Sequence, residues 1–128
     1  MASFARFEDI KAWQKALELT MGVYRMTSDG SLSKDFGLRD QIRRAAVSTM
    51  ANIAEGHGRR TNSEFANFLN LARGSAAEVQ SHLYVAKGLG YCSDVDFQEL
   101  YGLADEVSKM TLSLAKFLRE SEKKAAQN

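Results

Sequence analysis

Six arginines near the middle of the chain are the residues with the plainest capacity for chemistry. Five of them fall between positions 39 and 60, where only Asp40 and Glu55 oppose their charge. A planar guanidinium binds a phosphate or a carboxylate through two parallel hydrogen bonds, which a lysine cannot do. The set therefore predicts a surface that binds the phosphate backbone of a nucleic acid. Its members are Arg39, Arg43, Arg44, Arg59, Arg60 and Arg73.

The same arginines have a second interpretation, in which they form salt bridges rather than a binding surface. Arg39 and Arg43 lie one helical turn apart and share a face, so a neighbouring helix can approach both of them. The last third of the chain supplies candidate partners, namely Asp94, Asp96, Glu99, Asp105 and Glu106. The sequence alone leaves both interpretations open.

The segment Gly56-His57-Gly58-Arg59-Arg60 contains two of these arginines and two glycines. It lacks the lysine, the third glycine and the preceding strand that known nucleotide-binding loops require. Thr61 and Glu64 follow it with the spacing that opens a helix, and the free N–H groups of a helix start attract anions. The segment is predicted to be a tight joint between two helices, and contact with a phosphate backbone is the functional alternative.

A second group of polar residues lies beside apolar core positions. Asn52 and Glu55 are three residues apart, as are Ser75 and Glu78. Because buried polar groups need hydrogen-bonding partners, these four side chains are predicted to form a network inside the core. A role in ligand binding or catalysis is the alternative.

Catalytic and metal-binding patterns are missing from the sequence. A di-iron bundle needs Glu-x-x-His on two helices, whereas His57 and His82 are the chain's two histidines. No serine or cysteine stands in a recognisable nucleophile motif. We therefore expect no enzyme, no metal and no cofactor; a small-molecule or metal-dependent enzyme using Glu55, Glu78 and His82 is the third alternative.

Four helices are expected to position these residues. Apolar residues recur at steps of three and four in each long segment, as on one face of a helix, and none alternates as a strand would. The first two helices are predicted at Phe7 to Met26 and at Phe36 to Glu55. Thr61-x-x-Glu64 and Ser93-x-x-Asp96 predict where the third and fourth begin. The joints are predicted at Thr27 to Lys34, Gly56 to Ser63 and Gly88 to Asp94, with a left-handed Gly88 or Gly90 ending the third helix. The fold class is an all-α, antiparallel up-down four-helix bundle that forms a single domain over residues 1–128, with its core at about 7–120.

The first helix carries two apolar stripes, which is more than one core-facing side requires. One stripe holds Ile10, Trp13, Leu17, Met21 and Tyr24. The other stripe is predicted to form an interface with further copies of the chain, and it consists of Ala12, Ala16, Leu19 and Val23.

The overall composition is that of an ordinary folded protein. The chain has 128 residues, 45% of them apolar, and a formal net charge of +1. A charge so close to zero creates no global field for a nucleic acid, so any electrostatic binding must come from a local patch. Cys92 stands alone, and neither a leader sequence nor a membrane span is recognisable. We expect a soluble, cytoplasmic protein that does not bind membranes.

Several ordered motifs resemble the proteins of the 23S ribosomal RNA intervening-sequence family over roughly residues 7–120. The most specific are Asn52-Ile53-Ala54-Glu55-Gly56, Gly58-Arg59, Glu64-Phe65, Gly74-Ser75-x-x-Glu78 and Leu89-Gly90-Tyr91. The resemblance implies an antiparallel four-helix bundle, commonly a homopentamer, often encoded within bacterial 23S rRNA genes. It also implies kinship with the accessory variability determinant proteins, basic pentamers that bind nucleic acid and a reverse transcriptase.

These observations favour a non-enzymatic, oligomeric bundle that acts as an RNA-associated or nucleoprotein adaptor through the arginine patch. The expected partners are further copies of the chain, in a pentamer, and RNA or a nucleoprotein. The alternative is an oligomeric scaffold that binds a protein partner without touching nucleic acid and uses the arginines in salt bridges between subunits.

Overall fold

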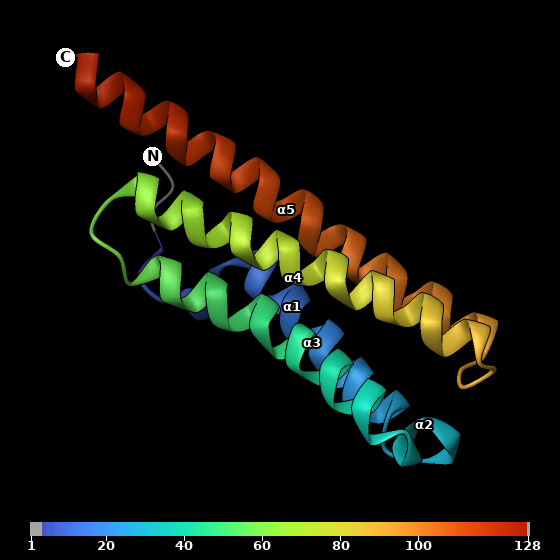
Figure 1. The fold of residues 1–128 in the computed structure, drawn as a ribbon. Coiled ribbons are helices and arrows are strands. Elements are labelled where there is room, and N and C mark those ends of the chain that lie inside the picture. Colours follow the sequence, from blue (N-terminus) through green and yellow to red (C-terminus); the bar gives the residue numbers. More distant parts are fainter. Residues whose placement is uncertain (1–3, 128) are drawn as a thin grey trace.

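The computed structural model describes residues 4–127, and within that range it is built from helices and their connecting turns. A single turn, η1 (Phe7–Asp9), precedes α1 (Lys11–Met26). A short helix, α2 (Gly30–Lys34), leads into α3 (Phe36–His57), which is followed by α4 (Asn62–Gly88) and α5 (Asp94–Gln127). The four long helices run alternately up and down (Figure 1). The predicted all-α bundle is confirmed.

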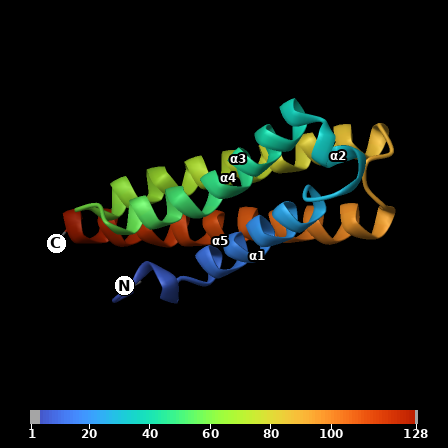
Figure 2. The same cartoon turned by 90° about the horizontal axis from the view of Figure 1, so that it is seen from below.

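Each long helix packs mainly against two others. Helix α1 contacts α3 and α5, and α4 contacts the same two from the other side. When the bundle is turned by 90° from the view of Figure 1, α3 and α4 form one layer and α1 and α5 form the other (Figure 2). A continuous hydrophobic core fills the space between the layers, with fully buried Leu19, Ile42, Leu69, Leu83 and Leu118 among its largest members. Burial of each such side chain contributes about 1.5 to 3 kcal/mol.

The apolar stripe of α1 that was predicted to face other subunits lies in the core of its own chain. Ala12 is 2% exposed and Leu19 is completely buried, and the whole stripe of Ala12, Ala16, Leu19 and Val23 faces the core of its own chain. Leu17, Met21 and Tyr24 are instead 36%, 49% and 40% exposed. The prediction of a subunit interface on the stripe of Ala12, Ala16, Leu19 and Val23 is therefore wrong. Its small alanines allow α3 and α5 to approach α1 closely.

The residues before α1 extend the bundle at its N-terminal end. The backbone carbonyl of Phe4 lies 2.8 Å from His57 Nε2 at the end of α3, and the rings of Phe7 and Trp13 meet edge to face at 5.2 Å. Because α1 is shorter than its neighbours, this segment covers core that α1 does not reach. Among the described residues no helix is long and apolar enough to cross a membrane.

Local signals place the helix ends well. Thr61 Oγ1 accepts from the Glu64 N–H at 3.1 Å, and Ser93 Oγ accepts from the Asp96 N–H at 3.1 Å, so both predicted caps are confirmed. Gly90 alone takes the left-handed conformation after α4, with φ of 72°, whereas Gly88 is the last helical residue. The first joint differs from the prediction, since residues 30–34 form α2 rather than a loop.

Candidate nucleic-acid interface

The structure divides the predicted arginine patch into separate places. Arg39, Arg43 and Arg44 lie near the start of α3, whereas Arg59 and Arg60 follow its end. Between Arg44 and His57 the helix advances by about 20 Å at 1.5 Å per residue. Arg73 lies in the middle of α4, apart from both groups. The six arginines therefore do not form one contiguous surface.

Arg39 and Arg43 serve the fold at the start of α3. Arg39 donates to the Ser33 carbonyl at 3.1 Å and to Asp40 Oδ1 at 2.9 Å. Arg43 Nε donates to the buried Thr27 Oγ1 at 2.6 Å, and its guanidinium lies 4.5 Å from the centre of the Tyr24 ring. These contacts tie α1 and α2 to α3, so neither guanidinium is fully available to a phosphate. Arg44 is exposed and has no ion pair or side-chain hydrogen bond within residues 4–127.

The turn between α3 and α4 holds its two arginines differently. Arg59 Nη2 lies 2.7 Å from Glu55 Oε1, and its guanidinium covers the Phe68 ring at 4.6 Å. Arg60 has an exposed side chain, while its backbone N–H donates to Glu64 Oε2 at 3.2 Å. The backbone of the turn is thus fixed by Thr61 and Glu64, and Arg60 is left to face solvent.

Close packing between α3 and α4 requires glycine at position 56, just before this turn. A Cβ atom built at Gly56 would lie 2.7 Å from Phe68 Cβ and 2.9 Å from Phe65 Cδ1. Such distances are too short for real contacts, so α3 and α4 can cross here only without a side chain. Gly58 has φ of −79°, an ordinary helical value. The predicted joint is confirmed, and its first glycine is required for close packing.

The second half of α5 adds positive charge beside this turn. Asn62 N–H donates to Glu122 Oε2 at 3.0 Å and Arg119 Nη2 donates to Asn67 Oδ1 at 2.8 Å, which places α5 against the start of α4. We call the exposed cations of this region the basic end: Arg59, Arg60, Lys116, Arg119, Lys123 and Lys124. Both the turn and the C-terminus lie at this end of the bundle (Figure 1).

The contribution of α5 was missed by sequence reasoning, although a signal exists. Residues 94–106 contain five acids and no lysine or arginine, whereas residues 109–124 contain five basic residues against two acids. A helix so divided carries opposite charges at its two ends. The acids of its first half are not partners of the arginines in the described part of the chain, where Glu106 pairs with Lys15 at 3.3 Å and Asp105 with Lys109 at 3.1 Å. The prediction of salt bridges to these acids is therefore wrong, although Arg39 and Arg59 do pair with Asp40 and Glu55.

The predicted polar network exists only in part. Ser75 is buried, and its hydroxyl lies 2.9 Å from Ser48 Oγ, which also accepts from Asn52 Nδ2 at 3.0 Å. Ser48, which connects the other two, was not predicted. Glu55 and Glu78 are exposed and take no part, so their assignment to a buried network is wrong. A helix position next to a core residue can still point outward, and these two acids do.

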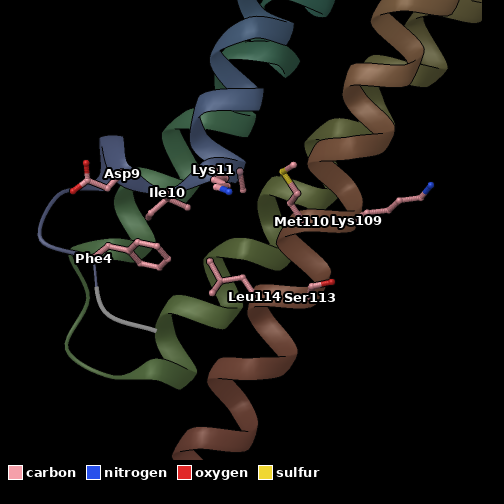
Figure 3. Close-up of a pocket in the computed structure, with 9 residues that line it drawn as sticks. Phe4, Asp9, Ile10, Lys11, Lys109, Met110, Ser113 and Leu114 are labelled. Atoms are coloured by element: carbon pink, nitrogen blue, oxygen red, sulfur yellow. The ribbon is translucent and has the colours of Figure 1, made fainter. Parts of the chain in front are cut away.

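An apolar groove of 560 Å³ lies between the N-terminal segment and α5. Phe4, Ile10, Met110 and Leu114 point into it, whereas Asp9 and Lys109 point away (Figure 3). No acid and base converge inside it to support catalysis. Among the described residues no group of three or more histidine, cysteine, aspartate or glutamate side chains is placed to hold a metal ion.

The fold and the charges define an all-helical bundle with six exposed cations at one end, where Glu55, Glu64, Glu120 and Glu122 also lie. Residues 8–113 match the model of the family described as 23S rRNA-intervening sequence protein, and the chain belongs to this family. The family resemblance seen in the sequence is confirmed. No match was found among curated proteins.

A solved structure supports the same assignment. It is a protein of unknown function from the S23 ribosomal protein family of Bacteroides thetaiotaomicron, which is 25% identical in sequence and superimposes with a TM-score of 0.74. The similarity covers 82% of the present chain and 98% of the other chain. The bundle is therefore shared over almost the whole length of that relative.

Proposed function

We propose that this protein is a non-enzymatic, oligomeric bundle that associates with RNA by binding its phosphate backbone at the basic end. The observation that carries the proposal is the convergence of the α3–α4 turn and the second half of α5 on one region of exposed positive charge. Membership of a family defined by 23S rRNA intervening sequences supports RNA as the polyanion.

The basic end suits backbone binding better than base reading. Its cations are long, exposed side chains, and Lys123 and Lys124 have no ion-pair partner within the described residues. Neutralised phosphates release counterions, so affinity for RNA should fall steeply with salt and depend little on sequence at this surface. In an oligomer each subunit repeats the basic end, and a polyanion that engages several of them binds more tightly.

Oligomerisation is supported by a groove between α1 and α5. Leu17, Met21 and Leu103 lie in it, and the charged residues around them are Glu18, Glu99 and Glu106 together with Lys15 and Arg25. A ring of identical subunits requires two different, complementary surfaces on each copy. The start of α3 offers a second surface, on which the positively charged Arg43 lies beside Tyr24 and Val47. A homopentamer built from these two faces remains our proposal for the assembly.

Salt titration of RNA binding tests the proposed function. The triple variant Arg60→Ala, Lys123→Ala and Lys124→Ala should flatten the log-log salt slope by roughly 2 to 2.7 units, at 0.7 to 0.9 per lost contact. The matched control removes three cations elsewhere, with Lys34→Ala, Lys87→Ala and Lys109→Ala, and should keep the wild-type slope. Equal slopes in both variants, or no binding of structured RNA at about 50 mM salt, would contradict the proposal.

A protein scaffold without RNA contact is the second candidate function, and the α1–α5 groove favours it because charged residues surround exposed apolar side chains there. In that case the α3 arginines pair with Glu99 and its neighbours across subunits, and high salt should dissociate the oligomer because such pairs are screened. Light scattering of Leu17→Glu with Met21→Glu measures the assembly itself. Val95→Glu is the control, since Val95 is 74% exposed at a different place. A wild-type monomer at micromolar concentration would exclude both forms of assembly.

A further inference from the structure

A polar hollow of 360 Å³ lies on the seam between α3 and α4, away from the basic end. Seams between packed helices are normally filled by apolar side chains, but here the small Ala45 leaves room. The polar residues around the hollow are Gln41, Arg44 and Ser48 from α3 and Ser75, Glu78 and His82 from α4.

The floor of the hollow is a fixed set of hydrogen bonds. Ser48 Oγ and Ser75 Oγ lie 2.9 Å apart, and Asn52 Nδ2 donates to Ser48 Oγ at 3.0 Å and to the Ser48 carbonyl at 2.9 Å. Ser75 is buried, so these contacts hold its hydroxyl in place. The floor is polar and already arranged before any ligand arrives.

The rim carries opposite charges that remain unpaired. Arg44 and Glu78 line the same hollow, yet within residues 4–127 neither forms an ion pair or a side-chain hydrogen bond. By contrast, three other arginines of the same part of the sequence already donate hydrogen bonds within the chain, namely Arg39, Arg43 and Arg59. Arg44 and Glu78 therefore present a donor fork and an acceptor pair separated by empty space.

We propose that this hollow binds an unstacked guanine base of single-stranded RNA, an inference that rests on the proposed RNA association. Guanine offers N7 and O6 as adjacent acceptors, which match the fork of Arg44. On its other edge N1–H and the N2 amino group are adjacent donors, which match the carboxylate of Glu78. Single-stranded RNA is read through these same base edges, with the base splayed out of its stack.

The other bases fit the two charged groups less well. Adenine presents an acceptor, N1, where guanine presents N1–H, so its ring nitrogen would face the Glu78 carboxylate. The pyrimidines have no N7 for Arg44. His82 lies one helical turn after Glu78 at the rim and can stack on an inserted base.

Base analogues test each contact separately. Short single-stranded RNAs that differ only in one base should bind about tenfold more tightly with guanine than with adenine. Inosine lacks the N2 amino group and 7-deazaguanine lacks the N7 acceptor, and each should lose part of this preference. Glu78→Gln should remove the penalty for inosine, and Arg44→Ala should remove the penalty for 7-deazaguanine. Both side chains are exposed, so neither variant should alter the helical circular dichroism spectrum.

Matched variants outside the hollow serve as controls. Glu120→Gln should leave every ratio unchanged, and Arg60→Ala should weaken all of the RNAs alike. Equal binding of guanine and adenine RNAs overturns this inference and leaves the proposed function standing. If no RNA binds at any salt concentration, the proposed function fails. A nuclear magnetic resonance titration then decides the inference: binding of GMP but not AMP, lost in Glu78→Gln, supports it, and equal or absent binding overturns it.

Discussion

The two ends of the bundle turn the chain by different means. At the basic end α3 and α4 are joined through residues 58–61, and Gly58 has φ of −79°. At the opposite end, which we call the acidic end after Asp94, Asp96 and Glu99 of α5 although the α3 arginines also lie there, Gly30 and Gly90 have φ of 69° and 72°. The N–H of Gly90 donates to the Lys87 carbonyl and that of Tyr91 to the Ala86 carbonyl, which closes the end of α4. Left-handed glycine thus forms the acidic end but not the basic one.

The comparison shows that glycine is used for two separate reasons in one small fold. At the acidic end it supplies a backbone conformation that other residues resist. At the basic end Gly56 supplies the absence of a side chain, because the two phenylalanines of α4 occupy the space. The turn that displays the arginines is therefore anchored by packing of aromatic rings, and the Arg60 side chain is left exposed to solvent.

The largest effect is expected at the basic end, from Gly56→Ala. The added methyl group would overlap Phe65 and Phe68, and overpacking of this kind costs about 1 to 3 kcal/mol of the free energy of unfolding. Urea denaturation measures it. Gly58→Ala is the control, since its Cβ would lie 3.5 Å from the Glu55 carbonyl, an ordinary contact. Equal stability of the two variants would show that the close crossing is not required.

A smaller effect is expected at the acidic end, from Gly90→Ala. The methyl group meets open space, so the cost comes only from the left-handed backbone and should be about 1 kcal/mol. Gly88→Ala sharpens the comparison because Gly88 is helical with open space around it, and alanine there should stabilise the fold by about 0.5 to 1 kcal/mol. Thermal unfolding of the two variants tests whether their melting temperatures shift in opposite directions. A shift in the same direction would contradict the proposed roles of Gly88 and Gly90.

The smallest effect concerns the charges of the acidic end. Burial raises the pKa of the Cys92 thiol, and the nearby carboxylates of Asp96 and Asp94 raise this pKa further. Since the thiolate is the reactive form, Cys92 should react with a thiol reagent at pH 8 more slowly than free cysteine does. Asp96→Asn removes one negative charge and should speed the reaction. Glu120→Gln, at the far end of α5, is the control; an equal acceleration there would rule out a local cause.

The helices and their ends were largely readable from the sequence. Apolar spacing gave the four long helices, and Thr61 and Ser93 marked two of their starts, because caps and periodicity act between residues that are close in the chain. Two short elements escaped: α2, and the separate turn η1, which takes the place of the predicted first turn of α1. Elements of three to five residues leave no periodic pattern. Only Arg59 and Arg60 of the basic end were predicted from the sequence. The other cations of this surface belong to α5 and lie about 60 residues later in the chain.

What the sequence by itself determined is therefore the class of fold and the location of its joints, which depend on local backbone preferences and on the period of apolar residues. The tertiary structure alone decided which stripe of α1 faces the core, which arginines are engaged and which acids point outward. Those outcomes depend on the partner that each helix face meets. It also decided that Arg44 and Glu78 share a hollow, because two helices must cross before residues 34 positions apart can line one cavity.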